Sequence, residues 1–158
     1  MARYLYYYTH AAEPFAATAA RIGGDPGCWL PEPAEPEASG WAVDLVAEGA
    51  LPSLIACRRA LVWTFATQLV TAGHLVVPLS WQAITAERWF PTFDGDLEVS
   101  ELAGGGCKIA LVGAYTPPLG VVGGTSDRLA GHHVAEACAR RFVLDVAARV
   151  TAPFNAAV

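Results

Sequence analysis

The sequence predicts an α+β fold in which a curved antiparallel sheet wraps around one long C-terminal helix. Strand-like stretches follow one another with short turns between residues 41 and 115, and a helical pattern begins near Asp127. Strands in direct succession form antiparallel hairpins, and the apolar face that they share needs a cover, which the helix supplies. We therefore expect a sheet of about six to seven strands in one domain that spans residues 1–158.

The composition is that of a globular chain with a sizeable core. Hydrophobic residues make up 54% of the sequence and charged residues 16%, which argues against disorder. The net charge of −5 argues against a nucleic-acid partner or an anionic membrane surface. No apolar run reaches the roughly 18 residues needed to span a bilayer, and the N-terminal stretch lacks the apolar core of a signal peptide. We expect a cytoplasmic protein with no membrane span.

The four cysteines, Cys28, Cys57, Cys107 and Cys138, show no metal-ligand spacing. We expect them to be reduced and buried, as small apolar side chains. The glycines of residues 113–124 lack the order of a phosphate-binding loop, so they are expected to shape the connection before the closing helix. The sequence thus predicts no cofactor and no metal.

The first forty residues contain one predicted strand and one predicted helix. The tyrosine-rich stretch 3–9 suits a strand, and a helix is expected from about Pro14 to Ile22. Residues 31–40 are rich in proline and glutamate. We expect them to form an exposed loop, because three prolines do not fit a central strand.

Alternation along the later strands predicts which side chains face the closing helix. Every second residue of the stretches 61–69, 75–83 and 109–115 is mostly apolar, which is typical of strands with one buried face. A register slip of one residue would reverse every one of these assignments. The residues predicted to face the helix are Leu61, Trp63, Phe65, Leu79, Trp81, Leu97, Ile109 and Leu111.

The predicted closing helix has one apolar side. At 100° per residue its apolar residues fall in one sector, and Arg140, Arg141 and Asp145 fall outside it. Two residues of the sector, Ala135 and Ala139, are small, so we expect a cavity between the sheet and the helix. The whole sector consists of Ala135, Ala139, Phe142, Val143, Val146 and Val150.

Three stretches carry a resemblance to a known superfamily. They are Val77-Pro-Leu-Ser-Trp-Gln-Ala83, Phe-Pro-Thr-Phe-Asp-Gly-Asp-Leu at 90–97, and Gly-Ala-Tyr-Thr-Pro-Pro-Leu-Gly-Val-Val-Gly at 113–123. Followed by the long helix, they resemble bacterial members of the START-related group. This group is also called SRPBCC, or the polyketide cyclase/dehydrase and lipid transport superfamily. The resemblance covers about residues 40–150, and it implies a helix-grip fold that encloses a small hydrophobic ligand.

The predicted cavity defines the candidate site residues. Arg128 and His132 lie on the inner sector of the helix, where they would meet a carboxylate, phenol or carbonyl of a ligand. Tyr115 continues an inward apolar face, and its buried hydroxyl needs a partner. These three are the candidate catalytic residues, with the alternative that Arg128 and His132 lie beyond the sheet rim and face water. The candidate ligand-binding residues are Trp63, Phe65, Trp81, Leu111, Tyr115, Ala135, Ala139 and Phe142.

His132 has two further interpretations. It stands four residues before Glu136, as in some helical metal pairs, but no third ligand clusters with them, so no metal site is expected. Its position near the predicted start of the helix disfavours the protonated ring, so we expect a neutral acceptor. His133 points about 100° away and is expected to face solvent.

Function follows from the fold only by analogy, so several hypotheses stay open. The first is binding of a small hydrophobic molecule in the cavity, as a carrier or a sensor. The alternative is an aromatase/cyclase-type enzyme acting on a polyketide-like or polycyclic substrate. A third is a closed core with a purely interaction role. The predicted partner is a small hydrophobic ligand, with no nucleic acid, and a homodimer stays open.

Overall fold

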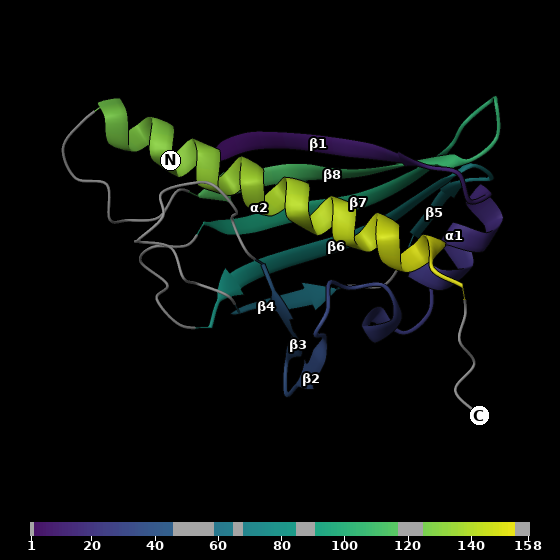
Figure 1. The fold of residues 1–158 in the computed structure, drawn as a ribbon, viewed down its shortest axis with the longest axis horizontal. Coiled ribbons are helices and arrows are strands. Elements are labelled where there is room, and N and C mark those ends of the chain that lie inside the picture. Colours follow the sequence, from purple (N-terminus) through teal and green to yellow (C-terminus); the bar gives the residue numbers. More distant parts are fainter. Residues whose placement is uncertain (1, 46–58, 65–67, 85–90, 117–124, 154–158) are drawn as a thin grey trace.

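The computed structural model describes residues 2–45, 59–64, 68–84, 91–116 and 125–153. Its main features are an antiparallel sheet of eight strands and the long helix α2 (Thr125–Thr151), which crosses one face of the sheet (Figure 1). The predicted α+β fold, a sheet gripping a C-terminal helix, is confirmed.

The strands form one sheet in which the first strand lies beside the last. The order across the sheet is β1-β8-β7-β6-β4-β3-β2, and β5 pairs with β6 as well. All pairs are antiparallel, as direct succession with short turns predicts. The strands are β1 (Arg3–Ala11), β2 (Glu35–Glu37), β3 (Gly40–Asp44), β4 (Arg59–Thr64), β5 (Gln68–Thr71), β6 (His74–Ala83), β7 (Thr92–Glu101) and β8 (Cys107–Thr116).

Two short helical segments follow β1. The helix α1 (Phe15–Ile22) starts after Pro14, its N-cap residue, and the 3-10 turn η1 (Pro26–Cys28) follows it. Within residues 31–40, Glu35–Glu37 form the exposed strand β2 rather than a loop. This strand is short and lies at the end of the strand order, which is where a sheet accepts proline.

The inner faces of β6, β7 and β8 are as predicted. Leu79, Trp81, Leu97, Ile109 and Leu111 are all buried. Their strands carry one apolar and one mixed face, so only one register buries the apolar side chains.

The predicted facing of β4 is wrong. Val62 is buried opposite Trp81, which places Trp63 opposite Ser80 on the other face of the sheet, and Leu61 faces the same way. The reason is that residues 60–63 are all apolar, so alternation does not identify their inner face. Phe65 lies outside the described residues.

The apolar side of α2 matches the prediction, because all six residues of the predicted sector are buried. The C-terminal end of this helix is fastened by arginines. The Arg21 guanidinium donates hydrogen bonds to the carbonyls of Arg149 and Ala152, at 3.2 and 2.6 Å. Arg149 donates to the Gly27 carbonyl at 2.7 Å and pairs with Glu32. Arg21 thereby satisfies carbonyls that the helix itself leaves unpaired, and α1 and η1 are held against its last turn.

The cysteines differ in part from the prediction. Cys107 and Cys138 are buried thiols, as predicted, but Cys28 is an exposed thiol, because it ends the surface turn η1. Cys57 lies outside the described residues. Within the described part of the chain, no helix has the length and apolar character needed to cross a membrane.

Candidate functional site

A row of buried aromatic residues crosses the inner face of the sheet. Trp81 on β6 is the register partner of Phe93 on β7, and Phe93 is the partner of Tyr115 on β8. The Trp81 and Phe93 rings stack with their centroids 4.5 Å apart. A Cβ atom on Gly95 or Gly113 would lie 2.8 or 2.7 Å from the tip of the Phe93 ring, so the two glycines make room for it.

The helix α2 meets this aromatic row at two places. Phe142 packs on Trp81 with a centroid separation of 5.3 Å. His132 packs on Tyr115 with a separation of 5.9 Å. The residues of α2 between these two contacts include small buried side chains, namely Ala135, Cys138 and Ala139.

Two polar groups of the aromatic row differ in their hydrogen bonding. The Tyr115 residue is 1% exposed, and its hydroxyl lies 2.5 Å from Nδ1 of His132. The indole nitrogen of Trp81 is buried but has no hydrogen-bond partner among the described residues. A buried donor without an acceptor is unfavourable by about 1–3 kcal/mol. The aromatic row thus contains one hydrogen-bonded polar group and one without a partner among the described residues.

Tyr115, His132 and Glu136 form a chain from the core to the surface. His132 Nε2 lies 3.0 Å from the Glu136 carboxylate, one helical turn away. A carboxylate only accepts hydrogen bonds, so Nε2 is the donor of this contact. In the neutral ring Nδ1 then accepts a hydrogen bond from the Tyr115 hydroxyl. The side chain of His132 is 37% exposed and that of Glu136 is 53% exposed. This Tyr115–His132–Glu136 chain thus links a buried phenol to solvent.

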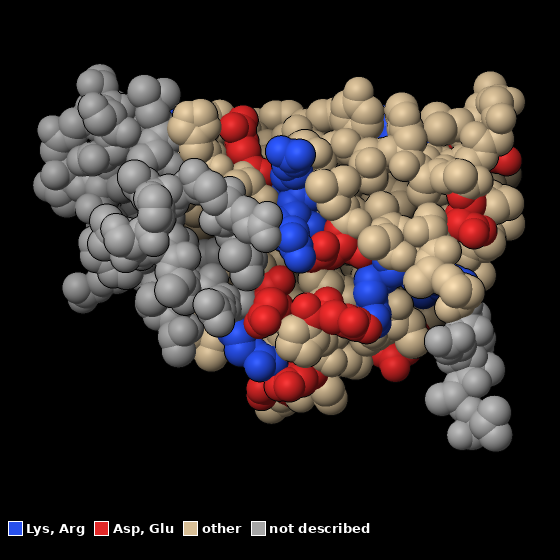
Figure 2. Space-filling view, in the orientation of Figure 1, with Lys and Arg blue, Asp and Glu red and all other residues tan. Residues whose placement is uncertain are grey.

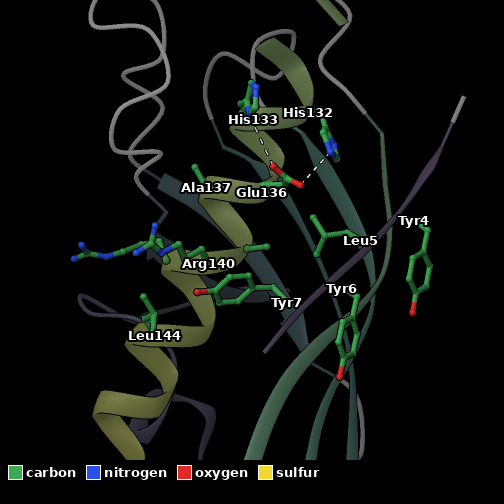
Figure 3. Close-up of a pocket in the computed structure, with 12 residues that line it drawn as sticks. Tyr4, Leu5, Tyr6, Tyr7, His132, His133, Glu136, Ala137, Arg140 and Leu144 are labelled. Carbon is green, nitrogen blue, oxygen red and sulfur yellow. Dashed lines mark ion pairs between the residues drawn. The ribbon is translucent and has the colours of Figure 1, made fainter. Parts of the chain in front are cut away.

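A groove runs beside this chain, between the edge strand β1 and the outer side of α2. Its volume is about 650 Å³. Leu5 and Tyr7 point from β1 toward the helix, and Tyr4 and Tyr6 point to the other side of the strand (Figure 3). We call it the β1–α2 groove; the residues that line it are Tyr4, Leu5, Tyr6, Tyr7, His132, His133, Glu136, Ala137, Ala139, Arg140, Arg141 and Leu144.

The groove combines apolar walls with charges of both signs. Glu136 lies between His132 and His133, at 3.0 and 3.8 Å, and Arg141 pairs with Asp145 at 2.8 Å. Basic and acidic side chains meet across the middle of the face that carries α2 (Figure 2). The groove is therefore suited to an apolar body with a polar or ionised end.

The structure places most of the predicted site residues on the inside. Trp81, Leu111, Ala135, Ala139 and Phe142 are all buried. Of the predicted catalytic residues it joins Tyr115 with His132. The side chain of Arg128 and the whole of Phe65 lie outside the described residues, and Trp63 lies on the far face of the sheet.

The location of His132 in the helix differs from the expectation. Since α2 begins at Thr125, His132 lies about two turns inside it, beyond the first turn in which the helix dipole acts. The carboxylate of Glu136, rather than the helix terminus, is its electrostatic neighbour. The side chain of His133 is 67% exposed, in agreement with the prediction.

The sequence reasoning missed Tyr7, Phe93 and Glu136 as site residues. Glu136 was considered together with His132 only as a possible metal pair, although the same spacing also fits a hydrogen-bonded pair. Among the described residues, no group of three or more His, Cys, Asp or Glu side chains is placed to hold a metal ion. Tyr7 gave no signal, because both faces of β1 carry aromatic residues.

No family model matches the sequence, and no curated protein matches it. Solved structures do resemble it in fold. Ara h 8.0201 shares 16% identity and a TM-score of 0.51, over 95% of this chain and 98% of that chain. The Zhui aromatase/cyclase from Streptomyces sp. R1128 shares 10% identity and a TM-score of 0.48, over 95% and 94% of the two chains. An uncharacterised protein from Rhizobium leguminosarum shares 11% identity and a TM-score of 0.42, over 91% and 95%.

At these identities the likeness concerns the fold alone. The fold of this chain is the helix-grip fold, so the fold that the sequence predicted is confirmed. The residues that act on a ligand have to be argued from the site itself.

Proposed function

We propose that this protein binds a small, mainly apolar molecule in the β1–α2 groove, as a carrier or a sensor. The observation that carries the proposal is the groove itself. It measures about 650 Å³, within the range of small-molecule sites, and it combines tyrosine, leucine and alanine walls with a few polar groups. A cytoplasmic location and a homodimer stay predictions.

The lining indicates the character of the ligand. Leu5, Tyr7 and Leu144 supply apolar and aromatic surface from both sides of the groove. The Arg140 guanidinium supplies hydrogen-bond donors at its helix side. A flat aromatic or polycyclic molecule with a hydroxyl, carbonyl or carboxylate end matches this arrangement.

A specific observation favours a second candidate function, proton-transfer chemistry of the aromatase/cyclase type on a polyketide-like or polycyclic substrate. It is the Tyr115–His132–Glu136 chain. Glu136 holds the His132 ring through Nε2, and Nδ1 faces the Tyr115 hydroxyl at 2.5 Å. In such a reaction the Tyr115 oxygen would take a proton from the substrate as its own proton passes to His132 Nδ1, so the two side chains would act as a proton relay. Arg128 remains a predicted third member of this set.

Binding is tested with an apolar fluorescent probe, 8-anilinonaphthalene-1-sulfonate. The variant Ala137→Phe places a large ring in the groove from a half-buried helix position. It should weaken probe binding about tenfold or more, because it removes the space that the probe occupies. Ala139→Phe is less informative, because Ala139 is fully buried and a phenylalanine there would strain the core.

Ala148→Phe is the matched control, since Ala148 is exposed on α2 and does not line the groove. It should bind the probe as the unaltered protein does. Equal probe affinity in Ala137→Phe and Ala148→Phe would contradict binding in this groove.

Chemistry is tested by incubating the protein with linear poly-β-ketone analogues and following ring closure by mass spectrometry and absorbance. If turnover is seen, His132→Ala should lower it about 10²- to 10⁴-fold. Probe affinity should change much less, because the apolar walls provide most of the contact area. Absence of any ring closure, or turnover that survives His132→Ala, would remove the second candidate and leave the first.

A further inference from the structure

A second hollow lies on the face of the sheet that is turned away from α2. Its volume is about 380 Å³. The strand residues Ser80, Gln82, Asp94 and Thr116 that line it alternate with buried inner residues, so they point outward. The hollow is lined by Ala2, Trp63, Ser80, Trp81, Gln82, Thr92, Phe93, Asp94, Ala114 and Thr116.

The strand register brings an indole and a carboxylate to opposite walls of this hollow. Trp63 on β4 is the partner of Ser80 on β6, and Ser80 is the partner of Asp94 on β7. Neighbouring strands are about 4.8 Å apart, so Trp63 and Asp94 are separated by about 10 Å, with only the small Ser80 between them. Ala114 on β8 continues the row and leaves the far side of Asp94 open.

Trp63 and Asp94, the two opposite walls of the hollow, differ in their contacts with the rest of the protein. The Trp63 ring packs over Gly40, where an added Cβ would lie 3.2 Å from Cδ1 of the indole. Asp94 makes no hydrogen bond or ion pair within the described part of the chain, and it is the one charged residue among the described residues that line the hollow. The Trp63 indole and the Asp94 carboxylate therefore both line a space of ligand size.

We propose that this hollow binds an organic cation, an ammonium or guanidinium group, between the Trp63 ring and the Asp94 carboxylate. A cation over an indole face is attracted by the ring quadrupole, and the opposite carboxylate neutralises its charge. The side-chain oxygens of Gln82, Thr92 and Thr116 accept N–H donors of such a group. This site lies on the other face of the sheet from the β1–α2 groove and is independent of the function proposed for that groove.

The electrostatics of this face favour a cation over a neutral sugar, which would also stack on an indole. Asp94, Asp96 and Glu98 alternate along the outward face of β7. Burial, and then the charges of Glu98 and Asp94, raise the pKa of Asp96 above its ordinary value of 3.8. Three acidic side chains of the described residues thus lie on the outward face of β7 next to the hollow, and His74 lies 3.5 Å from Glu98 farther along the sheet.

The test is a titration of the isotope-labelled full chain, followed by NMR. Tetramethylammonium and ethylguanidinium are the cationic probes, methyl glucoside is the neutral probe, and ionic strength is held constant. Saturable shifts should appear for a cation at the Trp63 indole N–H and at the amides of Ser80 and Asp94. The two cations distinguish a methylated ammonium from an arginine-like group as the preferred ligand.

Variants decide whether the shifts report this site. Asp94→Asn should weaken cation binding about tenfold, and Trp63→Leu about fivefold or more. Glu98→Gln is the control, because it removes the same charge from the same face about 14 Å away along β7, beyond the Debye length of about 10 Å at 0.1 M salt. It should change the affinity less than twofold. Trp63→Phe, which keeps an aromatic face, should bind more tightly than Trp63→Leu and serves if the latter unfolds.

Three results would overturn the proposal. The first is the absence of saturable shifts with either cation. The second is tighter binding of methyl glucoside than of the cations. The third is an equal loss of affinity in Asp94→Asn and Glu98→Gln, which would mean that cations are attracted to the acidic face without a defined site.

Discussion

The two halves of α2 differ in how they pack against the sheet. In the C-terminal half, Phe142, Val146 and Val150 are at most 1% exposed, and arginines fasten the end of the helix. In the N-terminal half, the partly exposed His132 and Glu136 stand beside small buried residues. Figure 1 shows the C-terminal half ending beside α1.

This difference separates stability from function along one helix. The C-terminal half fills its side of the core with large apolar side chains, which is the main source of folding free energy. The N-terminal half places the polar His132 and Glu136 in the groove, which the outer side of the C-terminal half also lines, so we expect it to contribute less to stability and more to binding. Substitutions in the two halves should therefore have different consequences, and the following experiments measure how sharp the division is.

The largest expected effect is that of Phe142→Ala. Phe142 is fully buried and packs on Trp81, so its loss leaves a cavity in the core. The free energy of unfolding should fall by about 3–5 kcal/mol in chemical denaturation. In the other half, His132→Ala should lower it less, by about 1–3 kcal/mol, because the buried Tyr115 hydroxyl loses its acceptor. Similar losses for the two variants would show that the division between the halves is not real.

The next effect is that of Arg149→Met, which keeps the apolar stem and removes the guanidinium. The hydrogen bond from Arg149 to the Gly27 carbonyl is lost, and the free energy of unfolding should fall by about 1–3 kcal/mol. The ion pair with Glu32 contributes little, because the Glu32 side chain is 68% exposed. Glu32→Gln is therefore the control and should lie within about 1 kcal/mol of the unaltered protein.

A smaller effect on stability is expected for Tyr115→Phe. It removes one hydrogen bond to His132, and the free energy of unfolding should fall by about 0.5–1.5 kcal/mol. The sharper readout is the ¹⁵N spectrum of the His132 ring, in which the Nδ1 signal should change and the Nε2 contact with Glu136 should persist. Tyr8→Phe, at an exposed position, should change neither quantity. An unchanged His132 spectrum in Tyr115→Phe would contradict the chain.

The smallest effect is expected far from both halves of α2, at Asp96 on the outer face of β7. Its pKa in the folded chain is raised above 3.8 by burial and by the charges of Glu98 and Asp94. The ionised carboxylate is therefore less favourable in the folded chain than in the unfolded chain. Stability is therefore lost as the pH rises from 3.8 through the higher folded pKa. Asp96→Asn should raise the Tm slightly at pH 7 and leave it unchanged at pH 3. A decrease at pH 7 would reverse this sign.

The sequence predicted those parts of the fold in which one face is apolar and the other is not. That condition holds for β6, β7 and the C-terminal half of α2, and their buried residues were assigned correctly. It fails for residues 60–63, which are all apolar, and for β1, which is aromatic on both faces. The facing of Trp63 and the role of Tyr7 were missed for this reason.

The groove itself was beyond reach of the sequence. It depends on β1 lying beside α2, and no local pattern records the pairing of segments so far apart. The sequence predicted the two residues Tyr115 and His132 but not the contact between them. Both residues were singled out as polar members of inward faces, but their hydrogen bond depends on how far along the sheet the helix lies.

The pairing of β1 with β8 has a consequence for the order in which the molecule is assembled. Arg3 pairs with Tyr115, so β1 has no strand to pair with until β8 has been synthesised. Closing so long a loop is slow, because its entropy is lost before the contacts are made. During synthesis the tyrosines of β1 therefore stay without their native neighbours until nearly all of the sheet has emerged. The binding groove, which needs both β1 and the helix that follows β8, is among the last features of the molecule to form.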